Sequence, residues 1–275
     1  MISVYFSATP SWGIIVREPN VTASQPSLQV PPPTTLLGAL AYGIAKALGI
    51  GYETKASAKG RKAEITNLPE AIYPSLLYAG ASLGPYTLHA DINRYIIRTF
   101  QKESRERRED PNYQFGALPV GKTYVSGEIR AVLAFDERKL TEAIEGYAGV
   151  KVKDLVDLLR ASASYITRLG SKEGIIAVNE VDVGEPKPLS SPDFESSLYQ
   201  YADRVKIKDV PECQLALGKY LTVRAWKGGF VAQGEPIYLL VPVCAGEFFQ
   251  SGKGAFTAKE GCKAYEFAGE GFAVC

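Results

Sequence analysis

The chain contains one histidine and one methionine among its 275 residues. His89 therefore has no second imidazole for an acid–base pair. The sequence also lacks a G-x-x-x-x-G-K-[ST] phosphate loop, a G-x-S-x-G nucleophile motif and an H-E-x-x-H zinc motif. The carboxylates are scattered and indicate no two-metal site. The sequence predicts no catalytic residue, no metal and no cofactor.

The four cysteines also lack the spacing of a metal site. Cys213, Cys244, Cys262 and Cys275 contain no C-x-x-C pair and have a single histidine to join them, which argues against zinc. We interpret them as reduced, mostly buried thiols. Disulfides are the alternative if the source is a hyperthermophile, and the scarcity of methionine and histidine is in keeping with such a source.

Long apolar runs and a strong net charge are missing as well. The longest apolar stretches, Leu36–Ala45 and Ile237–Ala245, are too short to cross a bilayer, and the first residues do not resemble a signal peptide. The expected location is the cytoplasm. The formal net charge is +1, so a nucleic-acid site has to be a local basic patch.

Three prolines at 31–33 introduce the most distinctive stretch that is present. They favour a stiff polyproline segment ahead of a helix, which Thr34 or Thr35 is expected to cap and Gly49 to end. The apolar stripe of this helix has spacings of three and four. It consists of Leu37, Leu40, Ile44 and Leu48.

Small residues lie on a second face of the same helix. Gly38, Ala41 and Ala45 allow a close approach, and free N–H groups of the first turn favour an anion. We expect RNA backbone or a neighbouring strand at Gly38, so that Gly38→Leu damages assembly or folding more than Gly43→Leu does. An ordinary first helix with a proline-rich lead-in is the alternative.

The order of the predicted elements indicates an α+β fold. Strands are expected at 2–7, 72–79, 124–135 and 175–183, with helices after 33 and at 137–147 and 152–169. Residues 53–67 are expected to be a solvated loop. The order β, α, β, long insertion, β, α, β is the ferredoxin-like pattern of an antiparallel sheet with helices on one face. Prolines at 186, 188 and 192 mark a boundary, so we assign 1–183 to this domain. A smaller β-rich domain at 184–275 has expected strands at 220–226, 230–233 and 237–243.

The insertion at about 85–122 carries basic and aromatic residues together. Six bases and two acids lie between 94 and 108, with Tyr95 and Phe100 among them. The bases are Arg94, Arg98, Lys102, Arg105, Arg107 and Arg108. Basic groups bind phosphates and aromatic rings stack on unpaired bases. Arg168 and Lys172, on either side of Gly170, add a second basic point. A solvated helix with i,i+4 ion pairs is the alternative for 103–110.

Two motifs resemble a known family. P-P-P-T-T-L-L-G-A-L-A-Y-G at 31–43 resembles the signature of the Cas-five family of CRISPR-associated proteins, within the repeat-associated superfamily of RRM-like (ferredoxin-like) proteins. R-L-G-S-K-E-G at 168–174, followed by an apolar strand, resembles its archaeal type I-A branch. The resemblance covers most of residues 1–183.

This resemblance implies a non-enzymatic subunit of Cascade, the crRNA-guided complex of antiviral defence. Such a subunit binds the 5′ handle of the crRNA, caps the backbone of Cas-seven subunits and docks the large subunit, so that target DNA is a partner only indirectly. An arched thumb leaves the palm between its second and third strands, which maps 85–122 to the thumb. We expect this thumb to be mobile until it binds RNA or a neighbouring subunit. The expected RNA-binding residues are Arg17, Gly38, Arg94, Tyr95, Arg98, Phe100, Lys102, Arg105, Arg168 and Lys172.

Two other functions stay open. A metal-independent ribonuclease would use His89 with Tyr86, Tyr95 or Lys122, and the resemblance implies that one branch of the family, type I-C, is a crRNA-processing nuclease. The Tyr–Lys–His triad of that branch is not clearly matched in this sequence. A protein-only scaffold with incidental RNA contacts is the second alternative.

Overall fold

The computed structural model describes residues 1–16, 27–51, 54–59, 62–97, 115–171, 173–213, 216–227 and 235–275. These residues form an α+β structure of mostly antiparallel sheets with few helices, which confirms the predicted class at that level. No helix in the described ranges is long and apolar enough to cross a bilayer. Several predicted features lie outside them: Arg17, Arg98, Phe100, Lys102, Arg105, Lys172 and the strand at 230–233.

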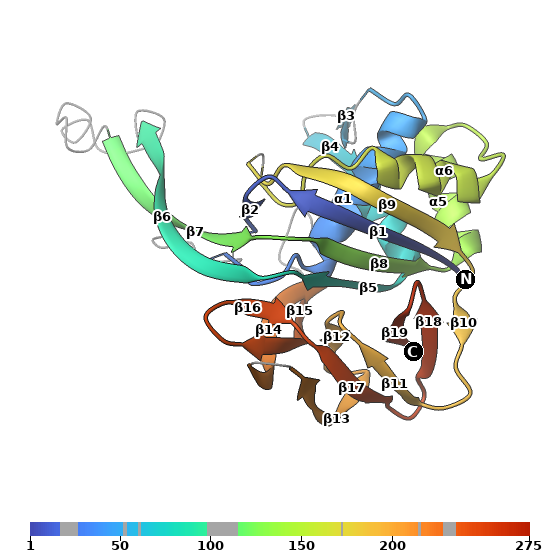
Figure 1. Cartoon of the computed structure of the whole chain (residues 1–275). Helices are drawn as coiled ribbons and strands as arrows, with labels where there is room; N and C mark the ends of the chain where they lie inside the picture. The colour runs from blue at the N-terminus through green and yellow to red at the C-terminus, as the bar shows by residue number, and fades with distance from the viewer. Residues whose placement is uncertain are drawn as a thin grey trace.

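A four-stranded antiparallel sheet lies at the centre of the molecule (Figure 1). β1 (Ile2–Pro10) runs between β8 (Ile129–Phe135) and β9 (Ile176–Gly184), and β5 (Leu76–Leu83) completes the order β5-β8-β1-β9. Every residue of β1 except Thr9 is buried. Both faces of the sheet are therefore covered.

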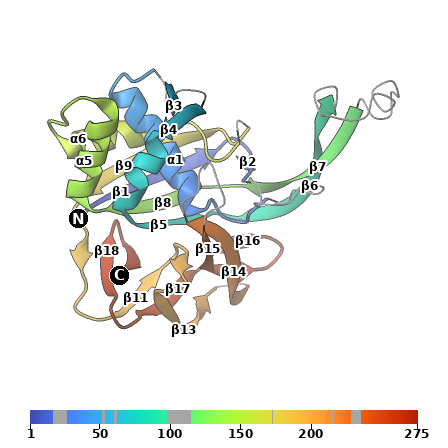
Figure 2. The same ribbon diagram turned by 180° about the vertical axis from the view of Figure 1, so that it is seen from behind.

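Helices cover one face of this sheet and the C-terminal strands cover the other, as Figures 1 and 2 show. Asn67 caps α2 because its Oδ1 accepts a hydrogen bond from the Glu70 N–H at 2.8 Å. Asp136 and Asp154 cap α5 and α6 in the same way. The helical elements are α1 (Pro33–Ala47), α2 (Leu68–Ile72), the 3₁₀ turn η1 (Tyr73–Ser75), α5 (Glu137–Ala148) and α6 (Leu155–Ser164).

The first helix has the predicted stripe and end but a different cap. Its stripe residues are fully buried except for the partly buried Leu48, and Gly49 has a left-handed φ of 68°. The prediction of a threonine cap is wrong: Pro32 occupies the N-cap position without a side-chain hydrogen bond. Prolines also remove N–H groups there, and the N–H groups of Thr35 and Leu36 bond the Pro32 carbonyl. The helix N-terminus therefore offers fewer free donors than expected.

Three predicted boundaries are wrong. The strand expected at 72–79 begins later, as β5, because α2 and η1 occupy 68–75. The region expected as a solvated loop at 53–67 contains a hairpin of β3 (Thr54–Lys59) and β4 (Lys62–Asn67). The single strand expected at 124–135 is the end of one strand and all of another, since Gly127 turns the chain with a φ of 100°. The helices at 137–147 and 152–169 and the strand at 175–183 are confirmed, with α6 shorter than expected.

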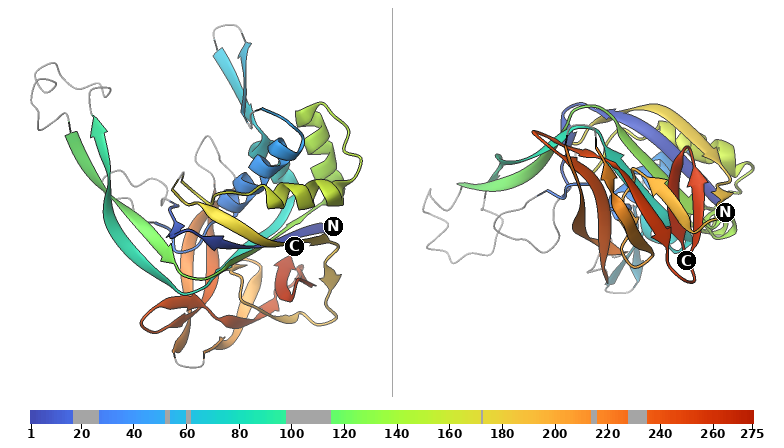
Figure 3. Two further views of the ribbon diagram at one scale, coloured as in Figure 1. Left: turned by 45° about the horizontal axis from the view of Figure 1, so that its top comes forward. Right: turned by 60° about the horizontal axis from the view of Figure 1, so that its bottom comes forward.

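A long antiparallel hairpin projects from the body of the molecule (Figure 3). β6 (Tyr86–Ile97) pairs with β7 (Phe115–Val125) from Tyr86–Val125 to Ile97–Phe115, and the short β2 (Gly13–Ile14) pairs with β7. Cross-strand pairing satisfies the backbone groups of these residues. Residues 98–114 lie outside the described ranges, so ordering of the insertion on RNA stays a prediction.

Ten strands follow residue 184 in the described ranges. β14 and β15 confirm the strands expected at 220–226 and 237–243. β16 contacts the foot of the projecting hairpin, because Phe249 pairs with Tyr86. The ten strands are β10 (Lys187–Pro188), β11 (Asp193–Ser196), β12 (Gln200–Tyr201), β13 (Val205–Glu212), β14 (Leu217–Lys227), β15 (Glu235–Ala245), β16 (Phe249–Ser251), β17 (Lys253–Ala258), β18 (Lys263–Phe267) and β19 (Glu270–Val274).

The main hydrophobic core includes residues from both sides of position 184. Tyr199 and Phe272 belong to the same buried cluster as Val4. The Tyr78 hydroxyl donates to the Tyr199 carbonyl at 2.7 Å, and its ring stacks on Phe272 at 4.7 Å. A smaller cluster around Phe256 lies within the C-terminal strands. The division into two domains at 183/184 stays a prediction.

The cysteines form two disulfides. Cys213 is bonded to Cys244 and Cys262 to Cys275, and no cysteine is free. The interpretation as reduced thiols is wrong, and the alternative of disulfides is the one that the structure has. β-pairing brings these distant positions together: β14 pairs with β15, and β18 pairs with β19.

Candidate nucleic-acid interface

A pocket of about 260 Å³ lies against the exposed side of α1. Its lining residues, which we call the α1 pocket, are Thr35, Gly38, Ala39, Tyr42, Arg168 and Gly170. Four of the six come from one helix, where positions three and four apart share a face. The other two come from the loop after α6. The pocket thus joins segments more than a hundred residues apart.

The loop that carries Arg168 is held by main-chain bonds. The Ser171 N–H donates to the Ile15 carbonyl at 2.9 Å, and the Leu169 N–H donates to the Gly174 carbonyl at 2.8 Å. Gly170 has a left-handed φ of 80°, and a Cβ there would lie 2.3 Å from the Ile15 oxygen. Glycine is therefore required at the turn that presents Arg168 to α1.

Two cations flank the single aromatic ring of the pocket. The Arg168 guanidinium carbon lies 5.8 Å from the centre of the Tyr42 ring, and the Lys46 Nζ lies 5.5 Å from it. Both are cation–π distances. Within the described part of the chain, neither cation has a carboxylate at ion-pair distance. Positive charge is therefore available to an anion at the mouth of this pocket.

The two glycines of α1 have opposite surroundings. A Cβ at Gly38 would meet nothing within 4 Å, whereas a Cβ at Gly43 would lie 1.9 Å from the Ser162 carbonyl oxygen of α6. The expectation of a neighbouring strand at Gly38 is wrong, and so is the expected order of damage to folding. Gly43 is the position of close helix packing, and Gly38 opens into the α1 pocket.

The other predicted site residues are placed only in part. Arg94 and Tyr95 lie in β6, opposite Leu118 and Ala117 of β7. Their side chains are outside the described part of the structure, as are the whole residues Arg17, Arg98, Phe100, Lys102, Arg105 and Lys172. Of the predicted RNA-binding residues, the structure brings Gly38 and Arg168 together.

The alternative nuclease site is described only in part, since the side chains of His89, Tyr95 and Lys122 lie outside the described part of the structure. The register of the hairpin pairs His89 with Lys122. Tyr86 is 1% exposed, and burial raises the pKa of its hydroxyl. A buried phenol with a raised pKa is a poor proton donor to an RNA strand at the surface. The described residues contain no group of three or more His, Cys, Asp or Glu that could hold a metal.

No family model matches the sequence. The "CRISPR-associated protein Cas5 3" of Saccharolobus solfataricus is 31% identical over 271 residues, which covers 94% of this chain and 93% of that protein. The chain belongs to the Cas5 family. The "CRISPR system aCascade subunit Cas5 1" of the same organism is 32% identical over 235 residues, or 84% of each chain. The resemblance to the Cas-five family is therefore confirmed.

The fold is also that of a solved CRISPR protein. A crystal structure of a CRISPR protein from Archaeoglobus fulgidus has a TM-score of 0.61 to this chain and covers all of it, at 21% identity. Matching covers 99% of that chain as well. The likeness supports the complete fold, from the central sheet to the C-terminal strands.

Sequence reasoning missed two residues of this candidate site, Tyr42 and Lys46. Tyr42 and Lys46 follow Gly38 at intervals of four, on the side of α1 away from its apolar stripe. This spacing was a usable signal, because a glycine, an aromatic and a base then share one exposed helix face. The proximity of Arg168 to that face had no signal in the sequence, since it depends on the packing of α6 against α1.

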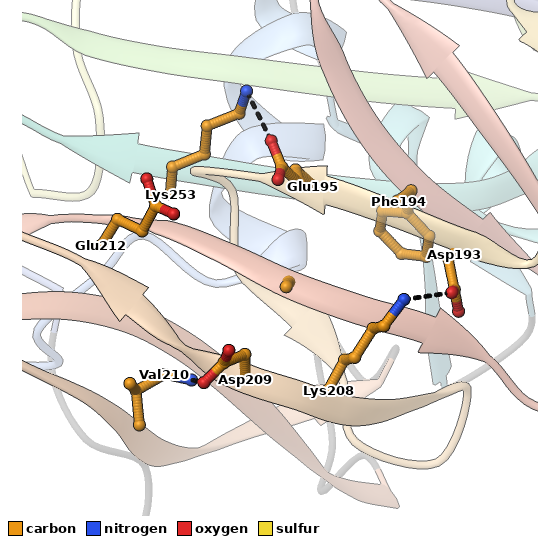
Figure 4. Close-up of a pocket in the computed structure, with 9 residues that line it drawn as sticks. Asp193, Phe194, Glu195, Lys208, Asp209, Val210, Glu212 and Lys253 are labelled. Atoms are coloured by element: carbon orange, nitrogen blue, oxygen red, sulfur yellow. Dashed lines mark hydrogen bonds and ion pairs between the residues drawn. The ribbon is translucent and has the colours of Figure 1, made fainter.

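A second pocket, of about 410 Å³, lies among the C-terminal strands and has the opposite charge (Figure 4). Lys253 pairs with Glu195 at 2.8 Å, and Lys208 pairs with Asp193. Hydrogen bonds from Lys208 and Thr257 hold the pKa of Asp193 below its usual value. Asp209 and Glu212 add two further carboxylates. With four carboxylates to two ammonium groups, this pocket repels phosphate, so the α1 pocket is the better nucleic-acid site.

Proposed function

We propose that this Cas5 chain is a non-catalytic, crRNA-binding subunit of a type I-A CRISPR Cascade complex, acting in antiviral defence in an archaeal cytoplasm. Its partners would be the 5′ handle of the crRNA, the Cas-seven backbone and the large subunit. The observation that carries this proposal is the 32% identity, over 84% of both chains, to a protein named as an aCascade subunit. The positive α1 pocket supports RNA as the ligand.

The strand order supports a ferredoxin-like, RRM-like palm. The four strands of the central sheet follow one another along the chain as β1, β5, β8 and β9. In the sheet they lie side by side in the order β5-β8-β1-β9, that is, second, third, first and fourth. Helices follow the first and third of them. This is the arrangement expected of a β-α-β-β-α-β unit. The β6–β7 hairpin leaves between the second and third strands, where a thumb would be expected.

The RNA-binding role of the hairpin is tested by a triple substitution. Arg94, Arg98 and Lys102 all change to Ala, and crRNA binding is measured over a range of salt concentrations. We expect weaker binding and a flatter salt dependence, by up to about one unit of log–log slope for each phosphate that the variant no longer neutralises. The charge-matched control changes Arg138, Lys139 and Arg160, which are exposed on α5 and α6. If both triple variants bind crRNA with the same affinity and salt dependence, the β6–β7 hairpin does not bind the RNA.

A metal-independent endoribonuclease is the second candidate function. The register of the hairpin favours it, because His89 of β6 and Lys122 of β7 are directly paired positions. Repeat RNA is incubated with the protein in EDTA. Under our proposal the RNA stays intact, whereas a single cut that disappears in His89→Ala would establish the nuclease.

A protein-only scaffold is distinguished by the wild-type chain alone. Isolated crRNA would then bind weakly, without a salt dependence that reflects specific phosphate contacts. Co-purification from the native host, with identification of the proteins and RNA that accompany the chain, tests the assembly itself. Recovery of Cas-seven without crRNA would favour the scaffold.

A further inference from the structure

The shape of the α1 pocket suits a small flat group. Gly38 and Ala39 contribute almost no side chain to the lining, and a Cβ at Gly38 would meet nothing within 4 Å. Tyr42 and Arg168 add two planar groups to the lining. Its 260 Å³ is below the range of about 300–1,000 Å³ typical of cofactor and drug sites. A fragment of a larger ligand fits this size better than a whole cofactor.

The chemistry of the pocket distinguishes a base from a bare phosphate. A phosphate site needs donors, but the helix donors nearby are reduced by the prolines at 31–33, and one charged side chain lines the pocket. An aromatic ring and a guanidinium plane both stack on flat π-systems. The Thr35 hydroxyl adds one group that can donate or accept a hydrogen bond.

Two cations lie close to the Tyr42 ring. Lys46 and Arg168 are both within 6 Å of the Tyr42 ring centre, and Lys46 is outside the pocket lining. Lys46 and Arg168 are exposed. Because both side chains are exposed, they can leave the face of the ring when a base stacks there and pair with the phosphates of that nucleotide.

We propose that the α1 pocket holds one nucleotide of the bound RNA strand, with its base stacked on Tyr42 above Gly38 and its phosphates at Arg168 and Lys46. The proposal rests on the proposed crRNA-binding function and names the place and the mode of one contact. Tyr42 would be the residue that positions the base, and Gly38 the residue that makes room for it.

The first test fills the pocket without disturbing the fold. Gly38→Leu places a side chain in open space on a helix, where Leu is favoured over Gly. Gly146→Leu is the matched control, because Gly146 lies in α5 and a Cβ there would also meet nothing within 4 Å. The melting temperature of both variants should be equal to that of the wild type or higher. The probe is crRNA transcribed from the CRISPR array of the source genome, and we expect Gly38→Leu alone to weaken its binding at least tenfold.

The second test examines whether the aromatic ring of Tyr42 contributes to crRNA binding. Tyr42→Phe keeps the ring and should bind crRNA within about twofold of wild type, whereas Tyr42→Leu should bind roughly five- to 150-fold more weakly, the range for loss of one stacked base. The salt dependence should be unchanged in Tyr42→Leu and flatter in Arg168→Ala. Tyr165→Leu, at an exposed tyrosine after α6, is the control for removal of a surface ring.

The outcomes separate the two proposals. If the wild-type chain binds crRNA and both Gly38→Leu and Tyr42→Leu bind it with the same affinity, the nucleotide pocket is overturned and the proposed function stands. Failure of the wild-type chain to bind crRNA would overturn both. Binding of free nucleoside monophosphates at micromolar concentration would overturn the assignment to a strand, because a single nucleotide would then be the ligand.

Discussion

Gly43 shows how one hydrogen atom in place of a side chain sets the distance between two helices. The Ser162 carbonyl of α6 occupies the space of its missing Cβ, at 1.9 Å. We predict that Gly43→Ala is strongly destabilising and that Gly43→Leu prevents folding, because the backbone of α6 cannot move as a flexible side chain would. Circular dichroism and thermal unfolding measure this. A Gly43→Leu protein that melts within a few degrees of wild type would contradict the close packing.

Glu270 is the buried charge that joins the C-terminal strands to the central sheet. Its carboxylate is 6% exposed and accepts bonds from the Ser196 hydroxyl at 3.1 Å and the Ser197 N–H at 2.8 Å. It also forms an ion pair with Arg130 of β8 at 3.6 Å.

We predict that Glu270→Ala lowers the free energy of unfolding by about 2–4 kcal/mol, because buried donors lose their acceptor. Arg130→Ala should cost less, since the arginine side chain is 43% exposed and water replaces it more easily. Urea unfolding of both variants gives the comparison. A larger loss for Arg130→Ala would reverse our account of which partner matters.

Two disulfides constrain the C-terminal elements. Cys213–Cys244 closes 31 residues across β14 and β15, and Cys262–Cys275 closes 13 residues around β18 and β19. Each disulfide lowers the conformational entropy of the unfolded chain, which stabilises the folded protein by about 3–4 kcal/mol in the chain-entropy description. The effect is greater for the longer loop.

We predict that Cys213→Ser with Cys244→Ser lowers the free energy of unfolding by up to ~4 kcal/mol, and that the second pair costs somewhat less. Denaturant unfolding of each double variant measures this. Dithiothreitol should destabilise the wild-type chain and leave a chain without all four cysteines unaffected. Identical midpoints with and without the reductant would show that the bonds do not contribute to stability in solution.

At the scale of the whole molecule, buried tyrosines link the two sides of residue 184. The Tyr199 hydroxyl donates to the Pro31 carbonyl at 3.0 Å, and the Ala79 N–H donates to the Tyr201 oxygen at 3.1 Å. Burial raises the pKa of Tyr78, Tyr199 and Tyr201, and it raises the pKa of Tyr220 to about 12.

These shifts predict a loss of stability in alkaline solution. Above about pH 10 an unfolded tyrosine loses its proton while the folded one keeps it, so that the unfolded state binds fewer protons. The contribution is complete below pH 10 and, for Tyr220, is lost as the pH rises to about 12. Each such tyrosine should lower the free energy of unfolding by about 1.4 kcal/mol per pH unit. Urea midpoints at several pH values check this, and Tyr220→Phe should reduce the slope by one proton. Equal midpoints at pH 8 and pH 11 would contradict it.

Features that depend on residues close together in the sequence are predicted better than features that depend on contacts between distant segments. The stripe of α1 and its glycine end depend on residues within one helix, and both are confirmed. The threonine cap is wrong because Pro32 occupies that position. The single strand at 124–135 is wrong because the apolar alternation continues through the turn at Gly127 and does not mark it. The cysteine pairs could not be predicted, since spacing along the chain does not report which strands become neighbours.

The α+β class, most of the helices and the family can be predicted from the order of the residues, because they depend on local periodicity and on contiguous motifs. The close packing of Gly43 against α6 and the open surroundings of Gly38 cannot, because both depend on how α6 lies against α1. The proximity of Arg168 to Tyr42 and the pairing of the cysteines depend in the same way on contacts between distant segments. A local pattern determines which face of a helix or strand is apolar, but the fold determines which distant segment contacts each face.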